Sequence, residues 1–180
     1  MIDGEEKKLV LNAINGEASA FGSLYDRYQS KIYRFIYLKV GHREEAEDLC
    51  HQVFLSAWQN IANYKFKGFS FSAWIYSIAR NKIIDYYRTK KNHQNVDDFQ
   101  IIIDGGPNTD LDDKIKKENL KKAIAKLSQI EQDIIILRFV EDLNLKEAAE
   151  ILKISEILLR VRQHRAIKKL GKILNIKDEK

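Results

Sequence analysis

Apolar residues recur at intervals of three and four along most of the chain, and this spacing predicts amphipathic helices. In the first half we expect helices over residues 17–40, 44–62 and 71–90. Gly41 follows the first of them, as is typical of a helix C-terminus. The second has the clearest apolar stripe, formed by Ala46, Leu49, Cys50, Val53, Phe54, Ala57, Trp58 and Ile61. The first half is therefore expected to be a compact helical domain.

A polar stretch, residues 92–113, separates the two patterned halves. It holds the only proline, Pro107, two adjacent glycines and six aspartates. Such a composition is typical of a linker, and glycine and proline are too scarce elsewhere for the tight turns of an all-β fold. The predicted fold class is all-α, with two small helical domains, residues 10–91 and 114–176, joined by a flexible acidic linker.

The second domain ends in a pattern that predicts a helix-turn-helix. A short helix over 146–152 and a tight turn precede a long helix from about residue 155 to 174. Small Ala148 and Ala149 let the two helices cross closely, and Ser155 suits an N-cap. The long helix carries the basic side chains of Arg160, Arg162, His164, Arg165, Lys168, Lys169 and Lys172. A basic helix of this kind fits the major groove of DNA, where arginine can bond two acceptors of guanine.

The charge is unevenly distributed. Residues 1–91 carry a net charge of +4, residues 92–119 carry −4, and residues 120–180 carry +5. Two basic domains around an acidic bridge indicate two contacts on one polyanion, although ordinary solvated charge explains the same counts equally well. The single cysteine, the lack of a signal peptide and the lack of a membrane-length apolar run predict a soluble, cytoplasmic protein.

Three segments together resemble a known family. Residues 47–58, Glu-Asp-Leu-Cys-His-Gln-Val-Phe-Leu-Ser-Ala-Trp, resemble the second conserved region of bacterial sigma factors. Residues 71–88 resemble the promoter-melting region of that family, and the helix-turn-helix resembles its domain that reads the −35 element. The order and spacing are similar to those of the extracytoplasmic-function (ECF) group of the sigma-70 family. The resemblance extends from about Ala18 to Leu174.

The resemblance implies a transcription initiation factor and not an enzyme. Its partners would be core RNA polymerase, through the β′ clamp and the β flap, and promoter DNA. Asp48, Gln52 and Phe54 would contact the clamp. No cofactor, metal, small-molecule substrate or membrane insertion is expected. Members of this group are commonly held by an anti-sigma factor, for which the sequence identifies no candidate.

The resemblance also places two sets of DNA contacts. In this family the loop that corresponds to residues 63–70 captures a base flipped out of the duplex, and the aromatic and basic side chains here suit unpaired bases. Trp74 and Ile75 are expected in the core. The residues expected at the −10 element are Tyr64, Lys65, Phe66, Lys67, Phe69, Arg80, Asn81, Lys82, Asp85 and Arg88. Those expected at the −35 element are Arg160, Val161, His164, Arg165 and Lys168.

The second domain departs from the family pattern at several positions. Ile157-Leu158-Leu159 stands where Gly-Thr-Val is common, and Gln163 stands where an apolar residue is usual. Lys153 replaces a turn glycine, Ser128 a proline and Gln132 an arginine. These differences bear on the geometry and specificity of −35 reading.

Two other functions are compatible with parts of the sequence. Glu44, Glu47, Asp48 and His51 share one helical face and could hold a metal, although a di-metal helical bundle needs a second Glu-x-x-His motif that is absent here. The other alternative is a helix-turn-helix transcriptional regulator whose first domain senses a ligand. Neither a nucleophile elbow nor a phosphate-binding loop is present.

Overall fold

The computed structural model describes residues 4–65, 70–91, 119–120 and 122–174. All regular structure in these residues is helical, which confirms the predicted all-α class. The chain divides into two compact units, residues 1–96 and 97–180. The predicted linker, residues 92–113, lies outside the described residues. Each unit is taken by itself below.

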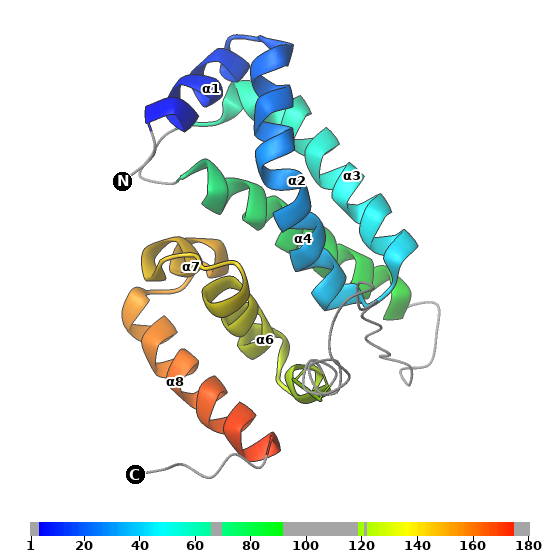
Figure 1. Ribbon diagram of the computed structural model, residues 1–180, viewed down its shortest axis with the longest axis vertical. Coiled ribbons are helices and arrows are strands. Elements are labelled where there is room, and N and C mark those ends of the chain that lie inside the picture. Colours follow the sequence, from blue (N-terminus) through cyan, green and yellow to red (C-terminus); the bar gives the residue numbers. More distant parts are fainter. Residues whose placement is uncertain (1–3, 66–69, 92–118, 121, 175–180) are drawn as a thin grey trace, which may run out of the picture. The chain divides into compact units, whose positions relative to one another are not determined.

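The first unit contains α1 (Gly4–Ile14), α2 (Ala18–Val40), α3 (Arg43–Asn60), the short 3-10 helix η1 (Ile61–Asn63) and α4 (Phe71–Lys91) (Figure 1). The three helices that the apolar spacing predicts are confirmed. Gly41 ends α2 in the left-handed conformation, at a φ of 76°. Helix α1 is an addition that the pattern did not predict.

The core of the first unit lies where α2, α3 and α4 pack against one another. Phe35 on α2 meets Tyr76 on α4 edge to face, with ring centroids 5.4 Å apart. The expected stripe is buried except at Trp58, which is exposed and whose ring contacts Phe21 at a centroid distance of 4.9 Å and an interplanar angle of 58°. The other buried side chains of this core include Leu24, Ile32, Ile36, Phe71 and Ile75.

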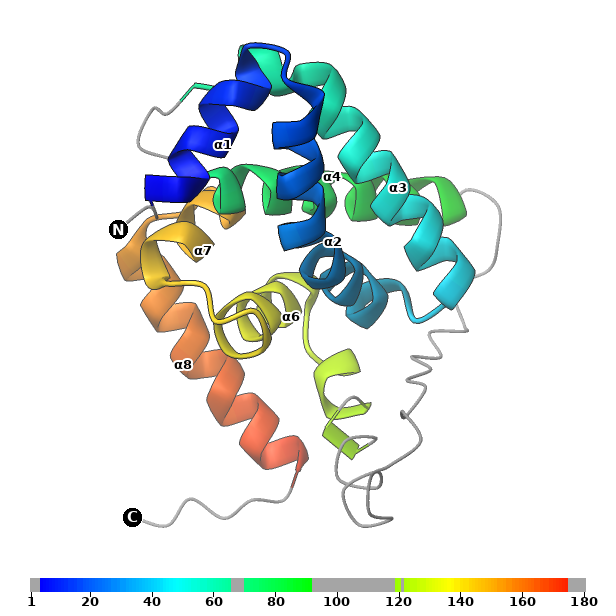
Figure 2. The same cartoon turned by 45° about the horizontal axis from the view of Figure 1, so that its top comes forward.

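Helix α1 packs on α2 and also touches η1 (Figure 2). Its Glu6 is buried, and the carboxylate accepts a hydrogen bond of 2.7 Å from the Tyr28 hydroxyl. Arg27 lies 3.8 Å from the same carboxylate. A buried carboxylate is stable only when it is paired in this way, so Glu6 anchors α1 to α2.

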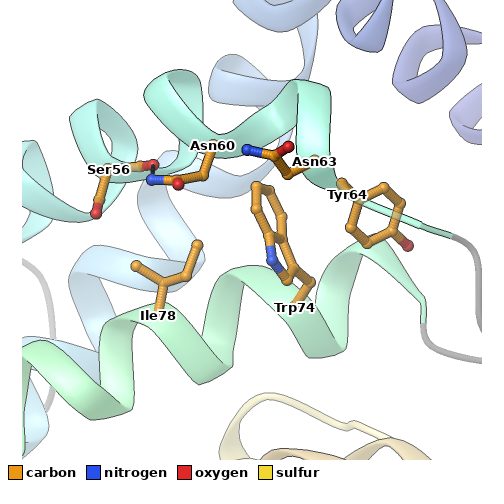
Figure 3. A pocket seen from close by; sticks show the side chains of 6 residues that line it. All are labelled: Ser56, Asn60, Asn63, Tyr64, Trp74 and Ile78. Atoms are coloured by element: carbon orange, nitrogen blue, oxygen red, sulfur yellow. Dashed lines mark hydrogen bonds between the residues drawn. The ribbon is translucent and has the colours of Figure 1, made fainter.

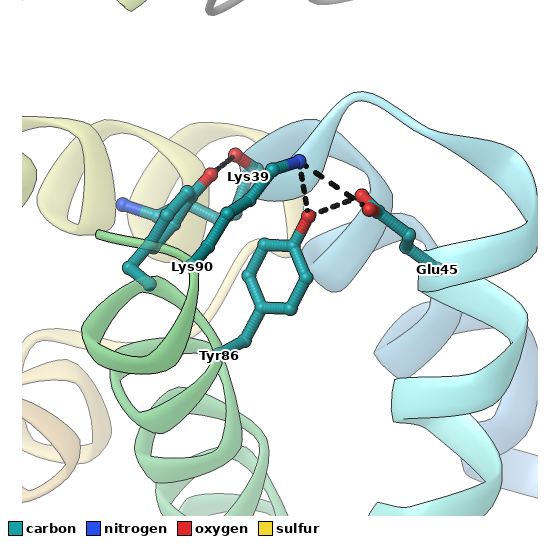
Figure 4. Close-up of polar contacts among 5 residues, drawn as sticks. Lys39, Glu45, Tyr86 and Lys90 are labelled. Carbon is teal, nitrogen blue, oxygen red and sulfur yellow. Dashed lines mark hydrogen bonds and ion pairs between the residues drawn. The ribbon is translucent and has the colours of Figure 1, made fainter. Parts of the chain in front are cut away.

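A polar cluster ties the last turns of α4 to the neighbouring helices (Figure 4). The Tyr86 hydroxyl donates to the Glu45 carboxylate, and Lys90 Nζ lies 3.3 Å from that carboxylate and 2.8 Å from the Tyr86 oxygen. Burial, together with the nearby Glu45 charge, raises the pKa of Tyr86. The Tyr87 hydroxyl donates to the Lys39 carbonyl. The C-terminal part of α4 is thus fixed against both α2 and α3.

The second unit contains α6 (Gln129–Ile135), which continues as a π-helical turn, η2 (Ile136–Val140), followed by α7 (Leu145–Leu152) and α8 (Glu156–Ile173). Helices α6 and α7 both pack on α8 (Figure 1). The fully buried side chains of this unit include Ile134, Ile136, Leu137, Ala148, Ile151, Leu159 and Ala166. The short and long helices expected of a helix-turn-helix are confirmed within one residue at each end.

The structure gives physical reasons for two departures from the family pattern. Lys153 ends α7 with a φ of 54°, so the lysine itself adopts the left-handed conformation that a turn glycine would supply. Gln163 is half-buried, and its side-chain oxygen accepts a hydrogen bond of 3.2 Å from Arg138 Nε. Arg138 also donates to the Leu143 carbonyl. A polar contact between η2 and α8 therefore stands where an apolar one is usual.

The other two departures lie at the start of α6. Ser128 is the N-cap, and its backbone N–H donates to the Glu131 carboxylate at 2.8 Å. Gln132 donates to the carbonyl of Leu127 at 3.0 Å and to that of Ala125 at 3.3 Å. Carbonyls at the end of a helical segment need such partners, so both residues stabilise the junction that precedes α6.

Candidate nucleic-acid interface

Helix α8 presents all five residues expected at the −35 element on its exposed side. Its buried side is defined by Leu159 and Ala166. Because a helix turns once every 3.6 residues, residues spaced by three and four from one another share a face. The face opposite Leu159 and Ala166 is exposed. We call its residues the α8 stripe: Ile157, Arg160, Val161, His164, Arg165 and Lys168. The stripe is basic, but its first turn is apolar.

Two caps and a close crossing hold α8 in a helix-turn-helix. Asn144 caps α7 by accepting from the Glu147 N–H at 2.9 Å, and Ser155 caps α8 by accepting from the Leu158 N–H at 3.2 Å. Ala148 and Ala149 are buried, as expected of small residues at a helix crossing. The N-terminal turns of α8 are therefore fixed in position and face solvent, which is the arrangement that a major-groove helix requires.

The first unit has a pocket of about 300 Å³ beside the start of the predicted base-capturing loop. Figure 3 shows the side chains of Asn60 and Asn63, from α3 and η1, across from Trp74 and Ile78 on α4. Tyr64 and Ser56 complete the lining. In this lining the Trp74 indole offers an aromatic surface for stacking, and the amide groups of Asn60 and Asn63 offer hydrogen-bond donors and acceptors. Such a lining suits a flat, polar heterocycle such as a nucleobase.

The sequence prediction located this region but not its full chemistry. Asn60 was not predicted, and Asn63 was included only as the first residue of the loop and not as an individual contact; the available signal was two amide residues at the end of the predicted helix, next to the loop. Ile75 is buried in the core as expected, whereas Trp74 is only half-buried and lines the pocket.

Of the loop residues predicted to contact DNA, Lys65 is the one whose side chain is both described and exposed. Tyr64 was expected to stack on DNA, but it is 6% exposed and its ring contacts both Phe71 and Trp74, at centroid distances of 6.0 and 5.0 Å. It therefore supports the pocket wall as part of the core instead of offering an open face. The remaining predicted loop contacts, Phe66, Lys67 and Phe69, lie outside the described residues.

The residues predicted on α4 fall on different sides of the helix. Asn81, Asp85 and Arg88 are exposed and share one face. Asp85 forms an exposed ion pair of 3.1 Å with Arg88, so the two charges of this face balance each other. Arg80 and Lys82 are half-buried at the flanks. Lys82 lies in a groove between α3 and α4 of about 460 Å³, which Gln52 and Asp85 also line.

Helix α3 carries the residues predicted to bind polymerase. Asp48 and Gln52 are exposed one turn apart. Phe54, by contrast, is 4% exposed and packs edge to face on Tyr25, so the expectation that it reaches a partner is wrong for this surface. The apolar residue that does reach solvent there is Leu55, which is 50% exposed and lies three residues after Gln52. Asp48, Gln52 and Leu55 form what we call the α3 stripe.

Two further features bear on the alternatives. Glu47 is engaged by Arg43 at 2.8 Å, and among the described residues no three histidine, cysteine, aspartate or glutamate side chains come together as metal ligands would. The metal-site alternative therefore gains no support. No helix in the described part of the chain is long and apolar enough to cross a bilayer.

Comparison with known proteins assigns the two units to two regions of one family. Residues 24–93 match the family model "Sigma-70 region 2", and residues 123–172 match "Sigma-70, region 4". The chain is 32% identical to the ECF RNA polymerase sigma factor SigW of Bacillus subtilis, over 93% of this chain and 96% of SigW. It is also 32% identical to BldN of Streptomyces coelicolor, an ECF RNA polymerase sigma factor, over 93% of this chain but 65% of BldN.

Solved structures share the fold. CnrH, solved in complex with the cytosolic domain of CnrY, superposes with a TM-score of 0.76 at 21% identity, over 97% of this chain and 99% of CnrH. The sigma factor RpoE of Bartonella quintana, solved with the anti-sigma factor NepR, gives 0.71 at 21% identity, over 87% of this chain and 98% of RpoE.

A helical unit with an indole-lined pocket and a second unit with a basic helix-turn-helix, each matched by its own family model, define a two-region protein of the sigma-70 class. Within that class, the chain belongs to the family of ECF RNA polymerase sigma factors.

Proposed function

We propose that this chain binds core RNA polymerase and directs it to specific promoters, as an initiation factor that works in the cytoplasm and catalyses no reaction itself. The observation that carries the proposal is the pairing of an exposed basic recognition helix, α8, with a polar, indole-lined pocket in the other unit. One surface suits duplex DNA and the other suits an unstacked base. A protein that opens promoters needs both.

In this proposal residues 10–91 bind polymerase and melt the −10 element, residues 92–113 act as the linker, and residues 114–176 read the −35 element. The pocket beside Asn63 receives a flipped base, with Asn81, Asp85 and Arg88 along the adjoining strand. Unstacking a base costs a few kcal/mol, and stacking on an aromatic face returns roughly 1–3 kcal/mol. The exposed side of Trp74 supplies that face.

The α3 stripe is the proposed contact with the β′ clamp, and the second unit is the proposed contact with the β flap. Asp48 and Gln52 supply polar groups, and Leu55 supplies apolar area that is otherwise left in water. An apolar centre within a polar surface is typical of protein interfaces. RpoE was solved with the anti-sigma factor NepR, and we propose that a protein of that kind restrains this chain as well.

The test combines core polymerase binding with transcription. Purified chain and core enzyme should give run-off transcripts from a limited subset of a genomic fragment library. Asp48→Arg should abolish pull-down of core enzyme because it reverses the charge of the α3 stripe, of which Asp48 is the one ionic residue. Asp26→Arg, an exposed charge reversal on α2, is the matched control and should bind normally. Absence of any selective transcript at every salt concentration tried would refute the proposal.

A ligand-sensing regulator is the competing function. It would bind its operator without polymerase, whereas the proposed factor binds promoter DNA tightly only as part of the holoenzyme. Gel-shift measurements on a selected promoter, with and without core enzyme, separate the two.

A further inference from the structure

Ile157 stands out on the surface of the second unit. It is 78% exposed, more than any other large apolar side chain of the described residues. Leaving a whole isoleucine in water forgoes the stabilisation that burial would give. A single exposed apolar residue is ordinary. Whether the exposure of Ile157 indicates a binding contact therefore depends on where the residue lies on the surface.

Ile157 is the first residue of the α8 stripe, at the N-terminal end of the helix. Val161 and His164 follow at intervals of four and three residues, and Val161 is also exposed. These residues occupy the first turns of the helix, which the Ser155 cap fixes. In a helix-turn-helix, the N-terminal residues of the second helix are the ones that meet the base edges.

The charges along the α8 stripe identify what covers it. Arg160 lies one turn from Ile157, and Arg165 and Lys168 lie further along the stripe, so a partner that covers the stripe must offer negative charge as well as an apolar contact. The major groove of DNA offers both, because phosphates line its walls and the 5-methyl group of thymine is the apolar group on its base edges. An apolar protein surface would instead have to cover three cations without partners for them.

We infer that Ile157, with Val161 beside it, reads the 5-methyl group of thymine in the upstream promoter element, so this residue sets part of the −35 specificity. The inference rests on the proposed function and adds the base feature that is recognised. Arg160, one turn after Ile157, and Arg165, one turn after Val161, are placed to add hydrogen-bond readout beside this contact.

The experiment removes one methyl group at a time from the DNA. Holoenzyme first selects bound fragments from a library randomised in the upstream element. Each thymine of the selected element is then replaced by deoxyuridine, which pairs identically but lacks the methyl group. For the unmodified chain we expect uracil to weaken holoenzyme binding about fourfold at one or two positions, the effect of exposing one methyl-sized group.

Variants on α8 connect the effect to the residue. Ile157→Ala should bind the thymine element more weakly and lose the difference between thymine and uracil. Ile167→Ala is the matched control: Ile167 is also an exposed isoleucine of α8 but lies ten residues away, about 15 Å along the helix. Its thymine-to-uracil ratio should stay at about fourfold.

Three outcomes would overturn the inference. One is a selected element in which uracil equals thymine at every position, although selection succeeded and the proposed function stands. Another is an unchanged thymine-to-uracil ratio in Ile157→Ala. The third is weaker binding of Ile157→Ala to core polymerase without DNA, which would make the covering partner a protein. Failure of the holoenzyme to select any fragment would overturn the proposed function together with this inference.

Discussion

Glu131 shows how one carboxylate can stabilise two junctions of the second unit. It accepts from the Ser128 N–H at the start of α6 and lies 2.9 Å from Lys169 Nζ on α8. Burial by itself would raise the pKa of Glu131, but the hydrogen bonds from Lys169 and Ser128 outweigh burial and lower it. The charged form is therefore favoured by folding, and it joins the cap of one helix to the flank of another.

The pH dependence of stability follows from the lowered pKa of Glu131. A carboxyl whose pKa is lowered by folding stabilises the protein above its ordinary value, here 4.5, and this contribution is lost as the pH falls through the folded-state pKa. Glu131→Gln keeps an acceptor for Ser128 but has no charge to lose. We expect its free energy of unfolding to fall less steeply below pH 4.5 than that of the unmodified chain, as measured by urea unfolding followed by circular dichroism. Equal slopes for the two proteins would contradict this account of Glu131.

At the scale of elements, α1 is the addition that changes the first unit. It lies outside the region 2 match, which begins at residue 24, yet its Glu6 is buried against α2. Tyr28, which donates to Glu6, also contacts the ring of Phe71, with the two ring centroids 5.4 Å apart. Phe71 in turn contacts Tyr64 at the pocket wall. Contacts thus run without a break from α1 to the candidate base pocket.

Tyr28→Phe tests the anchor of α1. The change removes the donor to a buried carboxylate, which typically costs about 1–3 kcal/mol. Both tryptophans, Trp58 and Trp74, lie in the first unit, so urea unfolding followed by tryptophan fluorescence reports on this unit alone. Tyr33→Phe, on the same helix, is the control. The Tyr33 ring stacks on Tyr37, and phenylalanine keeps this ring contact, so stability should change little. A loss of stability for Tyr33→Phe as large as that for Tyr28→Phe would contradict the assigned role of the Glu6 hydrogen bond.

At the scale of the whole molecule, the proposed function gives the two units separable tasks on one promoter. In this proposal basic side chains on α8 bind phosphates or base edges of the duplex, and the pocket of the first unit binds an unpaired base. Because contact with phosphates releases counterions, holoenzyme affinity for its promoter should fall steeply with salt. The steepness depends on the number of cations engaged.

Arg165→Ala tests this division of tasks. We expect holoenzyme binding to weaken by roughly 1–3 kcal/mol if Arg165 bonds a guanine in two places, with no change in the salt dependence. If Arg165 instead contacts a phosphate, the slope of log affinity against log salt should fall by about one. Filter binding at several salt concentrations measures both quantities. Lys126→Ala, an exposed change away from the α8 stripe, should alter neither.

The sequence by itself determined the helices and the family. Apolar spacing fixed α2, α3, α4, α7 and α8 closely, because each buries one continuous face whose period is visible in the residues. The α8 residues predicted to contact the −35 element are all exposed, since residues at helical spacing opposite the apolar ones face away from the core, and their contact with DNA stays a prediction. Helix α1 was missed because its short apolar pattern acquires meaning only against α2.

Only the tertiary structure decided which candidate residues reach the surface. Phe54 and Tyr64 are aromatic residues in functional segments, but neighbouring rings bury both, and no local pattern records that packing. Leu55 and Ile157 are apolar and would ordinarily be counted as core, yet the crossing of the helices leaves them in water. Sequence periodicity specifies which residues of a helix share a face, whereas exposure depends on whether another element covers that face, and this is a property of the assembled fold.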